Sequence, residues 1–111
     1  MAINSKAKGK VGELELSHKL QEYGFNTRRS QQFAGMNGDA DIVGLPAIHI
    51  ECKRVEKLVI EKAMEQSRSD AKENEMPVVM HRKNRQPWLV TMDLDAWMQL
   101  YEGWLCQRKE T

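Results

Sequence analysis

The chain has few cysteines, no long apolar run and almost no excess of either charge. Its two cysteines, Cys52 and Cys106, form neither a C-x-x-C pair nor a disulfide framework. No apolar stretch approaches the roughly 18 residues that a membrane-spanning helix needs, and residues 1–10 lack the apolar core of a signal peptide. These absences exclude zinc-finger, disulfide-rich secreted and membrane proteins. We therefore expect a cytoplasmic protein without a membrane partner.

The composition is that of one small folded domain. The chain has 111 residues, of which 41% are hydrophobic and 30% are charged. This balance supports a compact core and argues against a disordered chain. The length leaves no room for a separate substrate or regulatory domain. We expect a single domain over residues 1–111, with flexible tails at residues 1–5 and 106–111.

The charges are balanced overall but unevenly distributed. Lys and Arg total 17 against 16 Asp and Glu, which gives a net charge of +1 and departs from the strongly basic balance typical of nucleic-acid-binding proteins. Residues 1–30 and 81–92 nevertheless each have an excess of three positive charges, while acids concentrate in residues 61–75 and after residue 92. The basic segments are suited to phosphate contacts, and solubilising surface charge is the alternative interpretation.

The hydrophobic pattern predicts an α/β fold. In the first predicted helix, Leu16, Leu20 and Tyr23 recur at helical spacing, and Gly24 follows as a stop signal. The order of predicted elements is helix, three strands, helix, two strands, helix, which favours a central mixed sheet of about five strands flanked by helices. The predicted helices cover residues 6–23 and 58–74, and a final helix capped by Asp93 or Asp95 runs through Tyr101. The predicted strands cover residues 25–29, 40–44, 47–54, 78–81 and 88–92.

The most informative segment is GDADIVGLPAIHIECK. In a strand, side chains alternate between faces, so Glu51 and Lys53 project together from one face, roughly 6.6 Å apart, while apolar residues occupy the other. The preceding strand is close enough to pair as a hairpin, which would bring Asp41 beside Glu51. Alternation places Asp39 on the same face as Asp41, so either residue can fill this position.

Two neighbouring carboxylates repel each other, and a fold keeps them together where a cation or proton compensates. Mg²⁺ is the natural candidate because it prefers hard oxygen ligands. Lys53 adds a positive charge within reach of a bound phosphate. Asp41, Glu51 and Lys53 therefore predict a site that hydrolyses phosphodiester bonds with one or two metal ions. The alternative is that Glu51 and Lys53 merely neutralise each other at the surface.

The first predicted helix supplies a third carboxylate. Extending the stripe of Leu20 and Leu16 toward the N-terminus reaches Glu13, so a charge lies on the face that should be buried. A lone buried charge is costly. A nearby metal ion would remove that cost and make Glu13 a ligand, whereas fraying of the helix would leave Glu13 solvated.

The run KGKVGELELSHKLQEYGF, followed by DADIVG and HIECK, resembles the archaeal-type Holliday-junction resolvases and related phage enzymes of the PD-(D/E)XK nuclease superfamily. The resemblance covers roughly residues 5–92 and implies a restriction-endonuclease-like fold. It implies an active site of Glu13, Asp41, Glu51 and Lys53, in which the three acids and the backbone carbonyl of Cys52 bind Mg²⁺, with Mn²⁺ as a substitute. It also implies a homodimer that cuts opposed strands of a four-way junction during DNA recombination. Ala40 departs from the proline that marks many superfamily members.

Candidate DNA contacts come from the basic segments and from polar residues near the predicted site. They are Lys6, Lys8, Lys10, Arg28, Arg29, Ser30, Arg54, Gln66, Arg82, Lys83 and Arg85. The predicted loop over residues 30–38 is also expected to reach DNA. A second apolar stripe, formed by Val11, Leu14 and His18, predicts burial of the first helix against a partner subunit.

These observations lead to a first hypothesis and two alternatives. The first is a Mg²⁺-dependent, structure-selective DNA endonuclease of a bacterial or phage-infected cell, acting as a Holliday-junction resolvase. The second is a phage or restriction-type nuclease that nicks flaps or duplex DNA. The third is a catalytically silent DNA-binding or assembly protein on the same scaffold, against which the presence of all four site residues argues.

Overall fold

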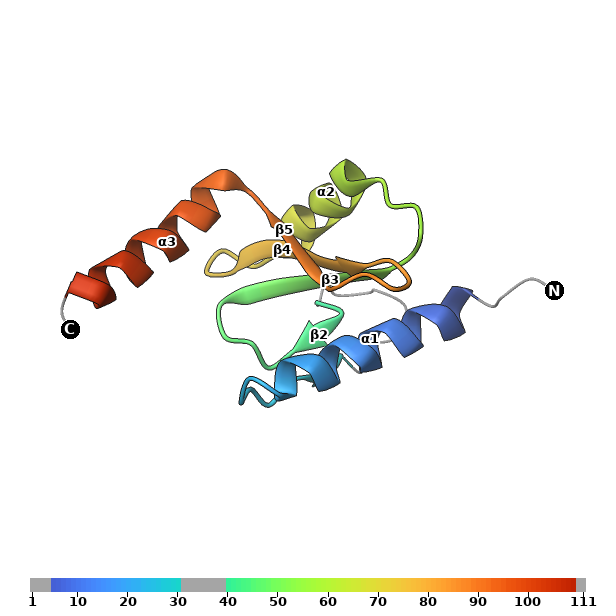
Figure 1. Ribbon diagram of the computed structural model, residues 1–111. Coiled ribbons are helices and arrows are strands. Elements are labelled where there is room, and N and C mark those ends of the chain that lie inside the picture. The colour runs from blue at the N-terminus through green and yellow to red at the C-terminus, as the bar shows by residue number, and fades with distance from the viewer. Residues whose placement is uncertain (1–4, 31–39, 110–111) are drawn as a thin grey trace.

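A computed structural model describes residues 5–30 and 40–109, with side chains from residue 9 onward. Five strands form one mixed sheet in the order β1-β2-β3-β4-β5 (Figure 1). Strands β3 and β4 are parallel, and every other neighbouring pair is antiparallel. This architecture confirms the predicted α/β fold. The strands are β1 (Arg28–Arg29), β2 (Ile42–Val43), β3 (Ile48–Arg54), β4 (Met76–Arg82) and β5 (Leu89–Met92), and the helices are α1 (Ser5–Gln21), α2 (Ile60–Asp70) and α3 (Leu94–Lys109).

The sheet lies between α1 and α2, which cover opposite faces (Figure 1). On the α1 face, Leu16 packs into a buried cluster with Ile50 and Cys52 of β3 and Val78 of β4. Full burial of a leucine side chain stabilises a fold by about 2 kcal/mol. The alternating pattern of β3 therefore turns its apolar side chains toward α1, as the sequence predicts.

The opposite face of the sheet is covered by α2. Val79 of β4 packs against Ala63 and Met64 of α2. The hydroxyl of Ser67 donates a hydrogen bond to the Val78 carbonyl at 3.0 Å, which fixes α2 on the sheet. Because α2 covers this face, Glu51 of β3 is only 3% exposed. The face predicted to carry the chemistry is thus largely removed from solvent.

Several predicted elements are shorter than expected, among them the strand predicted over residues 40–44, which is reduced to β2, and in two of these elements side chains capture the backbone. The predicted strand over residues 25–29 is reduced to β1, since Thr27 donates to the Ser17 carbonyl at 2.8 Å and Gln21 donates to the Thr27 carbonyl at 2.8 Å. These bonds tie the segment before β1 to α1. The predicted helix over residues 58–74 is shortened because the chain turns extended at Ala71, where Glu75 accepts a hydrogen bond from the Lys72 amide.

Helix α3 continues past Tyr101 to Lys109 and projects away from the sheet (Figure 1). Its start is anchored to α2 through Arg68, whose guanidinium pairs with Asp93 at 2.6 Å. None of the described helices combines the length and the apolar character needed to cross a membrane. Residues 31–38 of the predicted DNA-contacting loop, Asp39, and the side chains of Lys6 and Lys8 lie outside the described residues.

Candidate active site

The hairpin formed by β2 and β3 brings Asp41 to the middle of β3. The Asp41 amide donates to the Ile50 carbonyl at 2.9 Å, and the Cys52 amide donates to Asp41 Oδ2 at 2.8 Å. Asp41 therefore contacts the backbone on both sides of Glu51, with its main chain at Ile50 and its carboxylate at Cys52. The sequence predicts this juxtaposition from the short connection between the two strands.

Burial and neighbouring negative charges make both carboxylates hard to ionise. Burial is the main cause that raises the pKa of Asp41, and the Glu13 charge raises it further, against the hydrogen bond from Cys52. Burial, followed by the charges of Asp41 and Asp70, raises the pKa of Glu51 to about 7. A group that titrates near neutral pH because of burial and like charge is characteristic of functional sites.

Lys53 is the cation of this group. Its Nζ lies 3.7 Å from Glu51 Oε2, and its side chain is one-third exposed while that of Glu51 is 4% exposed. The Lys53 charge lowers the pKa of both Asp41 and Glu51 without cancelling the effect of burial. The ammonium is therefore anchored at the buried acids and still reaches solvent, where a phosphate can approach.

Glu13 of α1 lies near the same acids, close enough to raise the pKa of Asp41. Its side chain is 19% exposed, and Arg29 Nε donates to its Oε1 at 2.8 Å. The charge of Glu13, expected to need a metal ion, is thus balanced by Arg29 of β1. All four predicted site residues come together, and Arg29, a predicted DNA contact, is engaged with one of them.

A close contact between α1 and the end of β3 positions Glu13. A Cβ atom at Gly12 would lie 2.5 Å from Arg54 Cβ, so a larger residue would push the helix away from the strand. On the next turn, Glu15 accepts hydrogen bonds from Arg54 at 3.4 Å and Arg82 at 2.5 Å. Glu15 thereby joins α1 to the ends of β3 and β4, and it engages two more of the predicted DNA contacts.

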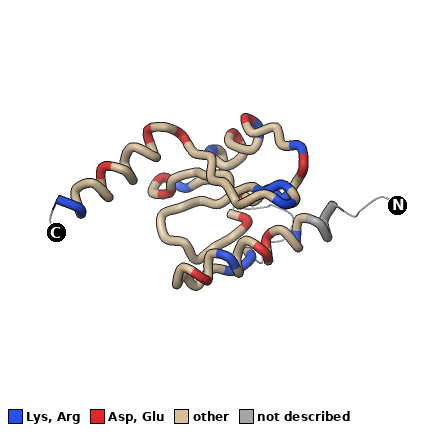
Figure 2. Tube along the Cα trace, viewed as in Figure 1, with Lys and Arg blue, Asp and Glu red and all other residues tan. Residues whose placement is uncertain are grey.

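The remaining predicted DNA contacts differ in accessibility. Lys10, Arg28, Gln66, Lys83 and Arg85 are exposed, whereas Ser30 is half-buried and its amide donates to the Asp41 carbonyl at 3.0 Å. Figure 2 shows the basic residues of the β4–β5 turn at the same end of the sheet as the first half of α1. This end of the molecule therefore presents the exposed cations Lys10, Lys83 and Arg85 near Arg54 and Arg82, which are paired with Glu15.

A groove of about 260 Å³ lies at the surface beside Lys53. Its lining includes Lys53, Lys57, Lys62 and Gln66. Three lysines and an amide form a surface suited to a phosphate backbone. The sequence analysis missed Lys57 and Lys62, which follow Glu56 and Glu61 directly and look neutralised in the sequence. Their common position relative to Lys53 depends on how α2 packs.

A second group of titratable residues adjoins Glu51. One ligand atom from each of His49, Glu51 and Asp70 lies within 4.8 Å of the others. Glu75 Oε1 lies 3.6 Å from His49 Nδ1. The sequence analysis identified neither Asp70 nor Glu75 because both lie beyond the crossover connection, about 20 residues from Glu51.

Comparison with known proteins agrees with this arrangement. The family model described as "Phage putative PDDEXK endonuclease" matches residues 4–109. The fold is similar to that of Hjc from Archaeoglobus fulgidus, a Holliday junction resolvase from an archaeal hyperthermophile, with a TM-score of 0.60 and 22% identity over 77% of this chain and 72% of that chain. No match is found among curated proteins. With nearly its whole length matched by the family model, the chain belongs to the phage PDDEXK endonuclease family.

Proposed function

We propose that this protein is a Mg²⁺-dependent endonuclease that hydrolyses phosphodiester bonds in branched DNA, with the four-way junction as its preferred substrate. The observation that carries the proposal is the buried pair Asp41 and Glu51 with Lys53 at 3.7 Å from Glu51. Burying two carboxylates side by side destabilises a fold, and a functional role explains why the pair is present. Membership of an endonuclease family supports the same chemistry.

The donor set fits Mg²⁺. Asp41 and Glu51 offer carboxylate oxygens at one buried position, with Glu13 nearby and the Cys52 carbonyl as a fourth oxygen donor. Mn²⁺ accepts the same ligands and would substitute. When bound, the ion would polarise the scissile phosphate and lower the pKa of an attacking water. Glu51 must lose its proton to bind the ion, so Mg²⁺ affinity should rise with pH.

Lys53 supplies the charge that the protein itself contributes to the reaction. Its ammonium is fixed by Glu51 and borders the basic groove. From this position it can orient a water molecule or stabilise negative charge that develops on the phosphate. Lys57 and Lys62 extend the positive charge along the groove and would hold the DNA backbone without reading its sequence.

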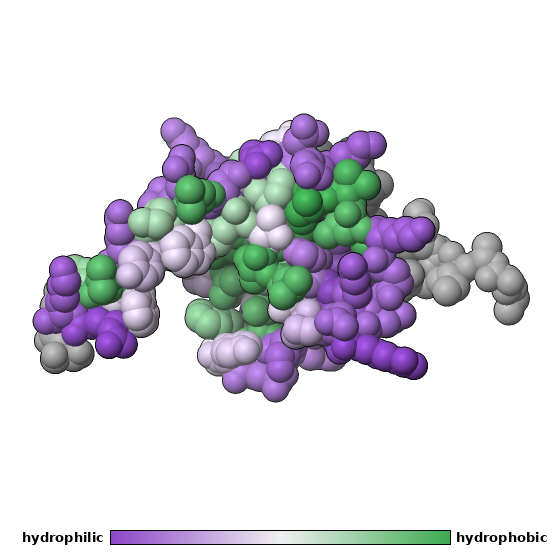
Figure 3. Space-filling model, turned by 45° about the horizontal axis from the view of Figure 1, so that its top comes forward, coloured by the Kyte–Doolittle hydropathy of each residue, from purple (hydrophilic) through white to green (hydrophobic). Residues whose placement is uncertain are grey.

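We also propose that the active unit is a homodimer. Val11 and Leu14 of α1 are 62% and 38% exposed, and Trp97, Tyr101 and Trp104 form an exposed aromatic ladder along α3. Figure 3 shows hydrophobic side chains gathered at the centre of one face of the molecule. Exposed apolar surface of this extent is typical of an interface.

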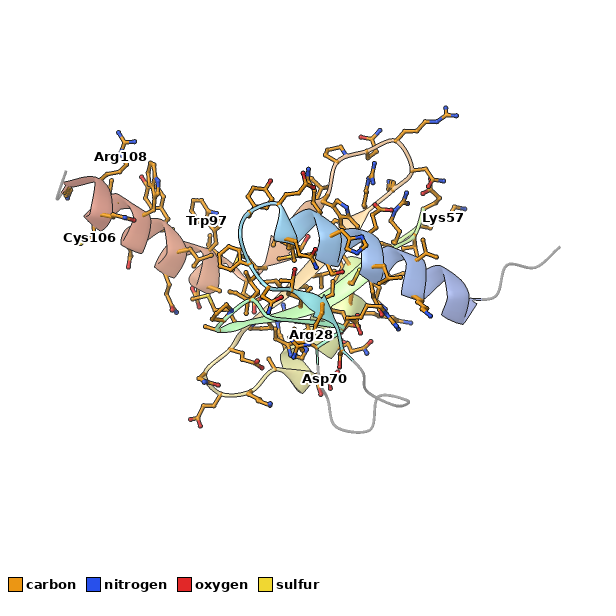
Figure 4. The ribbon with its side chains drawn as sticks, turned by 90° about the horizontal axis from the view of Figure 1, so that it is seen from below. Arg28, Lys57, Asp70, Trp97, Cys106 and Arg108 are labelled. Atoms are coloured by element: carbon orange, nitrogen blue, oxygen red, sulfur yellow. The ribbon has the colours of Figure 1, made fainter. Side chains whose placement is uncertain are left out.

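The charges of α3 favour a second copy of the chain as the occupant. Its first turn carries Asp95 and its last turn carries Arg108 and Lys109. Two antiparallel α3 helices would place acidic and basic ends together and cover both aromatic ladders. Figure 4 shows Trp97 and Arg108 on this projecting arm. A two-fold dimer would present two sites to a two-fold DNA junction.

The test is a panel of end-labelled DNA substrates offered with Mg²⁺ under single-turnover conditions. A resolvase cuts the four-way junction in two opposed strands near the branch point and cuts flap, duplex and single-stranded DNA much more slowly. Preference for flaps, or unpaired nicks in the junction, would favour the flap or nicking nuclease. Tight junction binding without cleavage of any substrate would favour the silent DNA-binding protein.

A further inference from the structure

His49, Glu51 and Asp70 form a compact group on the α2 side of β3. His49 and Glu51 are two residues apart on the strand and share its face, and Asp70 is the last residue of α2. One ligand atom from each lies within 4.8 Å of the others. His49 is 1% exposed and Glu51 is 3% exposed, while Asp70 is half-buried. The group therefore has a route to solvent through Asp70.

The His49 ring provides an independent indication of a ligand. Its Nε2 is buried and has no hydrogen-bond partner among the described residues. A buried polar atom without a partner is costly and calls for an explanation. Its other nitrogen, Nδ1, lies 3.6 Å from Glu75 Oε1. In metal sites, a histidine typically presents its second ring nitrogen to a carboxylate in this way.

We propose that His49 Nε2, Glu51 and Asp70 bind a divalent transition-metal ion such as Zn²⁺, Mn²⁺ or Co²⁺. One imidazole nitrogen and two carboxylates suit these ions, whereas Mg²⁺ prefers oxygen ligands alone. Ligands about 2.1 Å from an ion lie at most about 4.2 Å apart. The three ligand atoms are within 4.8 Å of one another, so a small movement of the half-buried Asp70 side chain completes the site.

This site adjoins the one proposed for Mg²⁺ and shares Glu51 with it. The inference rests on the proposed function only through this shared ligand. Asp41 belongs to the first site and Asp70 to the second. An ion at either site changes the affinity of the other through the shared carboxylate. The protein would consequently respond to the identity of the available metal ion and not only to its concentration.

The experiment measures Zn²⁺ binding to the full chain by calorimetry, in a Cys106→Ser background that removes an exposed competing thiol. Asp70→Asn should weaken binding roughly tenfold or more, the range seen when a carboxylate supporting a metal site is lost. Glu73→Gln, which changes an exposed acid shortly after α2, is the control and should leave binding unchanged. Long-range proton–nitrogen NMR should show the His49 Nε2 resonance shifting on addition of Zn²⁺.

Unchanged Zn²⁺ affinity in Asp70→Asn, or a His49 Nε2 resonance that does not respond to Zn²⁺, would overturn the proposal. Asp41→Asn separates it from the proposed function, because this variant should lose Mg²⁺-dependent cleavage while keeping Zn²⁺ binding. If Asp41→Asn removes Zn²⁺ binding and Asp70→Asn does not, the ion belongs to the first site. Zn²⁺ binding that depends on Asp70 in a protein without nuclease activity would support this site and refute the proposed nuclease.

Discussion

Replacing Glu51 with Gln should stabilise the metal-free protein at alkaline pH. The folded protein holds the Glu51 proton up to a pKa of about 7, against 4.5 for a free glutamate. Below pH 4.5 the group is protonated in both states. Between these values the unfolded chain releases the proton first, so the stability of the wild-type protein falls as the pH rises. The substitution removes this loss.

The difference between the two pKa values corresponds to roughly 3 kcal/mol at pH 9. Gln does not recover all of it, because Lys53 loses its partner and the new amide needs hydrogen bonds in a buried position. We expect a net gain of about 1–2 kcal/mol, or an increase in Tm of about 4–8 °C, for a domain of this size. At pH 5 the two proteins should differ little.

Thermal unfolding in EDTA from pH 5 to pH 9 measures this effect. Glu102→Gln, which removes an exposed carboxylate on α3, is the control and should show no comparable trend with pH. A difference in Tm between Glu51→Gln and wild type that stays constant, or that declines as the pH rises, would refute the reasoning. Mg²⁺ should raise the Tm of the wild-type protein more than that of the variant.

Three further predictions concern chemistry, DNA binding and assembly. Lys53→Arg should retain DNA binding but cleave poorly, because the guanidinium cannot occupy the position of the ammonium; single-turnover cleavage at the wild-type rate would contradict this. Replacing Lys83 and Arg85 with Glu should weaken junction binding and lower the slope of log affinity against log salt concentration by about 2, since two phosphate contacts are lost. An unchanged affinity would show that this turn is not part of the DNA surface. Trp97→Glu combined with Trp104→Glu should convert a dimer to a folded monomer in light scattering, whereas a persistent dimer would place the interface elsewhere.

The core of the site follows from local rules. Alternation along β3 places Glu51 and Lys53 on one face, and a short connection to the preceding strand makes pairing with Asp41 the simplest arrangement. The helical stripe similarly directs Glu13 toward the sheet. These relations span at most a hairpin or one helix face, so they can be read from residue spacing.

The surroundings of the site depend on contacts that spacing does not encode. Glu15 meets Arg82, which lies 67 residues away, only because β4 pairs in parallel with β3. Asp70 reaches Glu51 because α2 crosses the sheet and ends there. The shortening of β1 has the same origin, since the hydrogen bond from Thr27 to Ser17 is a tertiary contact.

The most direct test of the central claim is cleavage of a labelled four-way junction by wild type and Asp41→Asn, with DNA binding measured in parallel. Wild type should cleave in Mg²⁺ and not in EDTA. Asp41→Asn should cleave at least about 100-fold more slowly while binding the junction with nearly wild-type affinity, because the proposed role of this carboxylate is to hold metal and not phosphate. Cleavage by wild type in EDTA, or full activity in Asp41→Asn, would contradict the assignment of Asp41, Glu51 and Lys53 as a metal-dependent nuclease site.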